Sequence, residues 1–181
     1  MTTNDHRTPG PSEPPRPPTS AASSGPGAPG RFPAPDAPPL VVRTQADLER
    51  AWTRLMSPLG FSAAALWIGF VDAETDALLA QLVEVSDLPP TMDADDVESL
   101  ASLLRHLDAT ALGGSHRFAF LVARPGPDAV TDRDRAHARG LLEACARAGT
   151  SHEVVHVATA RRVRPVPLDD VAPVPDQPPH P

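Results

Sequence analysis

Cysteine, lysine, tyrosine and long hydrophobic runs are rare or absent in this chain of 181 residues. The single cysteine, Cys145, excludes a disulfide within the chain and leaves too few thiols for a cysteine-based metal site. The longest apolar run, residues 63–71, is too short to span a bilayer, and no apolar signal segment follows Met1. We therefore expect a cytoplasmic protein that does not enter a membrane.

The charge balance argues against a nucleic-acid partner. All 16 basic residues are arginines, they are outnumbered by 23 acidic residues, and the net charge is −7. An acidic chain lacks the phosphate-neutralising patch on which nucleic-acid binding depends. We interpret the small basic cluster of Arg161, Arg162 and Arg164 as a solvated edge.

Proline marks the domain boundaries. Of 24 prolines, 12 precede Leu40 and seven lie from Pro165 onward, which leaves five for the middle. Proline-rich segments favour extended polyproline II and provide little apolar surface for a core. The sequence therefore predicts disordered tails at 1–39 and 169–181 around one globular domain at 40–168.

Hydrophobic periodicity predicts an α/β (α+β) domain, with a mixed central sheet flanked by helices. The expected order is α-β-β-α-β-α-β-β. Helices are expected at 45–57, at about 93–110 and at 131–148, and strands at 63–71, 78–85, 117–123, 152–158 and 163–167. The last strand should lie at an edge of the sheet, because proline is tolerated only there.

Two helices have recognisable start signals. Thr44 with Asp47, and Thr131 with Asp134, have the spacing of a capping box, with aspartate in place of glutamate. Gly149 is expected to end the last helix as its C-terminal cap. Cys145 lies on the inward stripe of that helix, and we expect it to act as a small buried hydrophobe.

The segment from 66 to 168 resembles the JAB/MPN (JAMM) metalloprotease-like family, in particular the bacterial RadC type. The run Phe70-Val71-Asp72-Ala73 looks like the first strand and turn of the family, and residues 117–123 look like the strand before its metal motif. The run Arg124-Pro125-Gly126-Pro127-Asp128, followed by Thr131-Asp132-Arg133-Asp134, is similar to His-x-His-Pro-Ser-Gly followed by Ser-x-x-Asp. His156-Val157-Ala158-Thr159 resembles the next strand.

The resemblance implies a metal site that has lost its ligands. Family members bind zinc through the two histidines and the aspartate, and the serine helps to stabilise an oxyanion. In this chain the histidine positions fall on Val122 and Arg124, neither of which is a usable zinc ligand, and the serine and aspartate fall on Thr131 and Asp134. The resemblance therefore implies a degenerate site made of Arg124, Thr131 and Asp134, with no metal or other cofactor.

The proton-handling glutamate of the family lies on an earlier strand. Its position falls near Gln81 or Glu84, and the sequence does not fix which. For Arg124 we expect an ion pair with Asp128 or Asp134 across the turn, which contributes little stability if it is exposed.

Three functional hypotheses follow. The first is a non-catalytic domain that scaffolds an unknown protein partner. The alternative is a divergent metal-dependent hydrolase of peptides or isopeptides, with zinc held by Asp134 together with His137, His152 or His156. The third hypothesis sets the resemblance aside and leaves an α/β domain without an assigned role.

The histidines also have an ordinary interpretation. His137 and His152 would face solvent, and His156 would be a sheet residue without a ligand role. An exposed edge strand near 161–167 would allow a homodimer.

Overall fold

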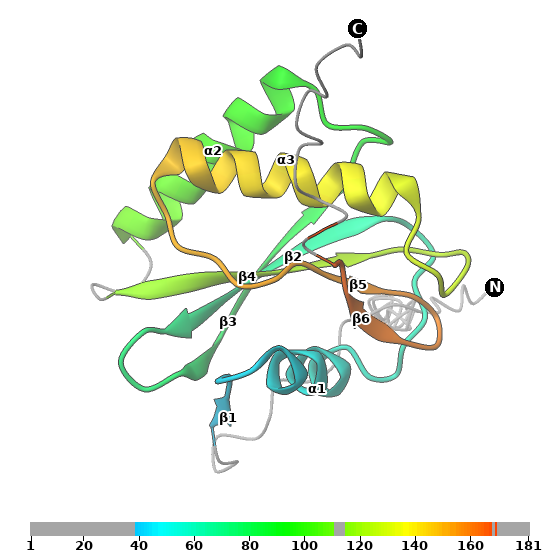
Figure 1. Cartoon of the computed structure of the whole chain (residues 1–181), viewed down its shortest axis with the longest axis horizontal. Helices are drawn as coiled ribbons and strands as arrows, with labels where there is room; N and C mark the ends of the chain where they lie inside the picture. The colour runs from blue at the N-terminus through cyan, green and yellow to red at the C-terminus, as the bar shows by residue number, and fades with distance from the viewer. Residues whose placement is uncertain (1–38, 111–114, 168, 170–181) are drawn as a thin grey trace, which may run out of the picture.

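The computed structural model describes residues 39–110, 115–167 and 169. These residues form a six-stranded mixed sheet and three helices, so the predicted α/β (α+β) class is confirmed (Figure 1). The elements are β1 (Leu40–Val41), α1 (Gln45–Leu55), β2 (Ala65–Asp72), β3 (Ala77–Ser86), α2 (Ala94–Thr110), β4 (His116–Ala123), α3 (Asp132–Ala148), β5 (His156–Ala158) and β6 (Val163–Pro165). The predicted tails at 1–39 and 169–181 lie outside the described residues, apart from residues 39 and 169.

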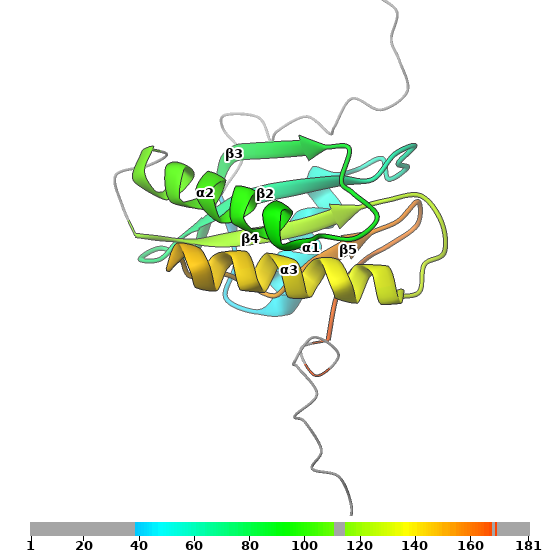
Figure 2. The ribbon, with the colours of Figure 1, turned by 90° about the horizontal axis from the view of Figure 1, so that it is seen from above.

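The sheet lies between two layers of helix. Its strand order is β1-β3-β2-β4-β5-β6, and β4 and β5 form the parallel pair that α3 connects. Helices α2 and α3 lie side by side over one face, and α1 covers the other (Figures 1 and 2). None of the helices in the described part of the chain has the length and hydropathy of a membrane span.

Strand β2 is buried on both faces because it is central in the sheet and both faces are covered. It pairs with β3 on one side and with β4 on the other, antiparallel in both cases. Alternate side chains point to opposite faces of a strand. Thus Leu66, Ile68 and Phe70 pack with α2 and α3, whereas Trp67 and Val71 belong to a second core under α1.

The predicted elements are found, with two corrections. The structure adds β1, a two-residue strand that pairs with β3 and is too short to leave a periodic pattern. The strand predicted at 152–158 is regular only at 156–158. Phe118 is bridged to His152, whereas Leu121 pairs with His156, so this segment has one residue more than β4 between the two points. One extra residue on one of two paired strands is the feature that defines a β-bulge, and here it interrupts the regular strand.

The predicted helix ends are confirmed at both signals. Thr44 with Asp47, and Thr131 with Asp134, each form a reciprocal capping box. Gly149 is in the left-handed conformation with φ of 73°, and its amide donates to the carbonyl of Ala146. The helix thus ends at a position where a β-carbon is unfavourable.

Replacing this C-terminal cap should destabilise the domain. We expect Gly149→Ala to lower the free energy of unfolding by about 1 kcal/mol, because a β-carbon disfavours the left-handed conformation. Gly149→Asn is the matched control and should cost less, since asparagine adopts that conformation more readily. Urea denaturation measures both values, and equal stability of Gly149→Ala and the native chain would contradict the expectation.

Candidate functional site

The end of β4 and the start of α3 are joined by a buried ion pair. Arg124 follows the last residue of β4, and Asp134 lies in the first turn of α3. The guanidinium of Arg124 donates from Nε to Oδ1 of Asp134 and from Nη2 to Oδ2, both at 2.6 Å. The two side chains are 8% and 0% exposed, so the pair is bidentate and largely shielded from water.

The remaining donors of Arg124 are taken up by the turn itself. Nη1 donates to the carbonyls of Pro125 at 3.3 Å and Pro127 at 3.0 Å, and Nη2 donates to the carbonyl of Ala129 at 2.9 Å. A guanidinium has five N–H groups, and the five hydrogen bonds account for all of them. Sequence reasoning missed the three carbonyl acceptors, although two prolines close together in a short turn signal a rigid backbone.

Asp134 both caps its helix and neutralises Arg124. Its Oδ2 accepts from the backbone amide of Thr131 at 2.7 Å and from the hydroxyl of Thr131 at 2.8 Å. Burial by itself would raise the pKa of Asp134, but the hydrogen bonds from Arg124 and Thr131 and the charge of Arg124 lower that pKa below its usual value. Its contribution to stability is therefore present above about pH 4 and is lost as the pH falls further.

Arg124 pairs with Asp134, one of the two partners expected, and the pair is buried. Asp128, the other expected partner, instead accepts a hydrogen bond from the hydroxyl of Thr159 at 2.7 Å. Val122, which occupies one histidine position of the resemblance, packs in the core under α2 and α3 and is 1% exposed. Arg124, Thr131 and Asp134 are therefore brought together as expected, as a closed polar cluster.

The two candidates for the family's glutamate both lie on β3. Gln81 and Glu84 are exposed. Glu84 is directly opposite Trp67, so its side chain shares the α1 face of the sheet with that residue. Helix α3 covers the other face, and Glu84 therefore does not face the ion pair.

The ordinary interpretation of His137 as a solvent-facing residue is wrong. His137 is 1% exposed, because it lies on the face of α3 that packs onto the β3–α2 connection. Its Nε2 donates to the carbonyl of Pro89 at 2.8 Å, since a carbonyl can only accept. Burial lowers the pKa of His137 below its usual value, which favours the neutral ring.

The other two candidate histidines come from the segment that pairs with β4. His152 is exposed, as the ordinary interpretation expects, and His156 is fully buried in β5. Nδ1 of His156 donates to the carbonyl of Val154 at 2.9 Å, and burial lowers its pKa. Within 39–110, 115–167 and 169, no three His, Cys, Asp or Glu side chains gather closely enough to hold a metal ion.

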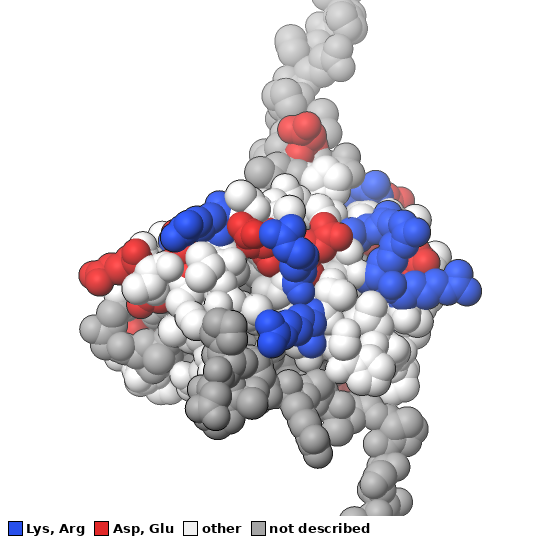
Figure 3. All heavy atoms as spheres, turned by 90° about the horizontal axis from the view of Figure 1, so that it is seen from below, with Lys and Arg blue, Asp and Glu red and all other residues white. Residues whose placement is uncertain are grey.

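Cys145 is buried, as expected for a small hydrophobe. Burial raises the pKa of its thiol to about 11, so the thiol is neutral at physiological pH. Of the basic cluster expected at a solvated edge, Arg161 and Arg162 are exposed, whereas Arg164 is half-buried. On the α1 side of the molecule, basic side chains are interspersed with acidic ones (Figure 3). The absence of a nucleic-acid partner stays a prediction.

Removal of Arg124 should be costly because it leaves the buried carboxylate of Asp134 without a positively charged partner. We expect Arg124→Met to lower the free energy of unfolding by about 3–5 kcal/mol. The double variant Arg124→Met/Asp134→Asn should recover part of this loss, because the unpaired charge is removed. Arg50→Met breaks an exposed pair with Asp47 and serves as a control with little effect. A double variant no more stable than Arg124→Met alone would contradict this explanation.

His137 and His156, two of the three buried histidines in the described part of the chain, should make stability depend on pH. Their folded pKa values are lowered, so below about pH 6.5 the unfolded chain binds protons that the folded chain does not. The free energy of unfolding should fall as the pH drops below about 6.5, by at most about 1.4 kcal/mol per pH unit for each histidine.

Urea denaturation at several pH values measures this slope. His137→Gln and His156→Gln should each make it shallower, whatever they do to stability at neutral pH. His152→Gln removes an exposed histidine and should leave the slope as it is. An unchanged slope in both buried-site variants would refute the assignment.

Comparison of the chain with protein-family models, with curated proteins and with solved structures gives no match. The resemblance to the JAB/MPN family therefore remains a prediction from the sequence.

Proposed function

We propose that this domain is a non-catalytic protein-interaction module, in which the buried pair of Arg124 and Asp134 occupies the position of a metal site in a JAB/MPN fold of the RadC type. The observation that carries the proposal is the complete pairing of Arg124, whose five N–H groups all have acceptors. The guanidinium of Arg124 supplies the positive charge at this position. It neutralises Asp134, the only metal ligand of the family that has a counterpart in this chain.

The ligand requirements of a hydrolytic zinc ion are not met by the described residues near Arg124. Such a zinc needs three protein ligands and an open position for water. Asp134 accepts four hydrogen bonds from Arg124 and Thr131, and the Nε2 atom of His137 is bonded to Pro89. The alternative, a divergent metal-dependent hydrolase, would require Asp134 to leave Arg124 and join histidines that now lie elsewhere.

The setting of the domain is part of the proposal. A single buried cysteine and the acidic composition are consistent with a cytoplasmic scaffold that binds another protein. Thr131 keeps only a structural role in this view, because its hydroxyl and amide hold Asp134 at the start of α3.

The zinc content of the full-length chain tests the non-catalytic role. The protein is purified without a histidine tag from cells grown with added zinc, and metal is measured by mass spectrometry. We expect zinc far below one ion per chain and no release of product from peptide or isopeptide substrates. Near-stoichiometric zinc that is lost in Asp134→Asn but kept in Asp132→Asn would overturn the proposal. Asp132→Asn is the matched control, because Asp132 lies two residues before Asp134 and its side chain is fully exposed.

A further inference from the structure

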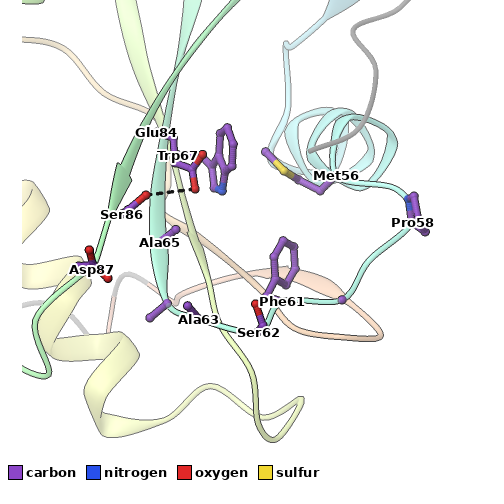
Figure 4. A pocket seen from close by; sticks show the side chains of 12 residues that line it. Met56, Pro58, Phe61, Ser62, Ala63, Ala65, Trp67, Glu84, Ser86 and Asp87 are labelled. Atoms are coloured by element: carbon purple, nitrogen blue, oxygen red, sulfur yellow. Dashed lines mark hydrogen bonds between the residues drawn. The ribbon is translucent and has the colours of Figure 1, made fainter. Parts of the chain in front are cut away.

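A small pocket opens at the end of α1, on the face of the sheet opposite α3. It has a volume of about 150 Å³ and lies between the C-terminal end of α1, the connection at 58–64 and the ends of β2 and β3. Its lining includes Met56, Phe61, Trp67, Glu84 and Asp87. Figure 4 shows Met56, Phe61 and Trp67 pointing toward one another from three segments, with the Glu84 carboxylate beside the indole.

Strand pairing places the aromatic ring and the carboxylate together. Trp67 and Glu84 are direct cross-strand partners of β2 and β3, so their side chains project from the same face. Helix α1 ends at Leu55 and the chain then turns away at Pro58, so the helix does not cover this end of the face. Trp67 stays 8% exposed, and Glu84 is an exposed acidic residue at the margin of an otherwise apolar core.

The charged side chains that line the pocket are all acidic. Its lining includes two carboxylates, Glu84 and Asp87, and no basic side chain among the described residues. Neither carboxylate forms an ion pair within the described part of the chain, and Glu84 accepts only a long hydrogen bond of 3.5 Å from the hydroxyl of Ser86. The negative charge at this site is thus left without a basic partner from residues 39–110, 115–167 and 169.

We propose that this pocket binds the cationic head of a lysine or arginine side chain of a partner protein. The face of an indole attracts a cation through the ring quadrupole, and a neighbouring carboxylate adds an ionic contact to the same group. Met56 and Phe61 would contact the aliphatic stem. The inference rests on the proposed function, which requires a protein partner, and it names the chemistry of that partner.

The size of the pocket fits a single side chain. Sites for drug-sized ligands have volumes of roughly 300–1,000 Å³, whereas this pocket has about 150 Å³. A large cofactor would not be enclosed. The alternative occupant of similar chemistry is a small free alkylammonium ion, and the experiment distinguishes the two.

The test is a titration of the full-length, ¹⁵N-labelled protein followed by the indole N–H signal of Trp67 in NMR spectra. The chain has two tryptophans, and the fully buried Trp52 serves as an internal reference. The probes are short capped glycine peptides with a central lysine or arginine, the same peptides with acetyl-lysine or citrulline, and tetramethylammonium chloride. All are compared at equal ionic strength.

We expect the lysine or arginine peptide to shift the Trp67 signal saturably and the neutral peptides to leave it unchanged. Glu84→Gln should weaken binding about tenfold. Trp67→Phe should weaken it less, because it keeps a smaller aromatic face. This variant lacks the Trp67 indole, so its binding is followed by the backbone amide signal of Glu84, the cross-strand partner of position 67. The matched control is Glu74→Gln, which makes the same charge change in the exposed β2–β3 turn, roughly 20 Å away along the strands, and should not affect binding.

Three results would overturn the inference. They are the absence of a saturable shift with either charged peptide, equal binding of charged and neutral peptides, and saturation by tetramethylammonium alone. Its failure is distinguishable from failure of the proposed function. A metal-free chain that ignores the peptides refutes only the pocket assignment, whereas a zinc-loaded chain refutes the non-catalytic role whatever the peptides do.

Discussion

The ion pair of Arg124 and Asp134 fixes the connection on which the second half of the fold depends. It links the last residues of β4 to the first turn of α3, and the carbonyls of the turn complete its hydrogen bonding. Taking two charges out of water is expensive, and it is tolerated only where geometry and additional hydrogen bonds offset the cost. The closed turn holds the start of α3 beside the end of β4, and the apolar face of the helix then packs onto the sheet.

Much of the fold was predictable because it depends on local patterns. The apolar run at 63–71 predicts a strand buried on both faces, and helices on both sides of the sheet explain why β2 meets that expectation. Thr44, Thr131 and Gly149 mark helix ends through interactions with residues close in sequence. The two residues of β1 were not predictable, since their strand exists only through pairing with β3.

The candidate site was less predictable because burial is a property of the tertiary structure. The sequence places Arg124 and Asp134 within reach of each other, but not the shielding that makes their pairing strong. For the same reason His137 was expected in solvent, although the β3–α2 connection that covers it is some fifty positions away in the chain.

The sequence contains only one weak indication of the pocket beside Trp67. It is Glu84, an acidic residue on the otherwise apolar face of β3. The ion pair and this pocket lie at the same end of the sheet on opposite faces, since Ala65 lies opposite Ala123 on one side and opposite Ser86 on the other.

The two outermost strands have a consequence for how this sheet behaves in a concentrated solution. β1 has two residues and β6 has three, the last of them a proline, and Pro167 follows shortly after. A proline provides no amide hydrogen, so another chain laid along β6 would find few hydrogen bonds to make. Short, proline-marked margins of this kind are a means by which proteins prevent β-sheets from adding further strands and aggregating. Two copies that associate along this margin would therefore depend on side chains for most of their contact energy.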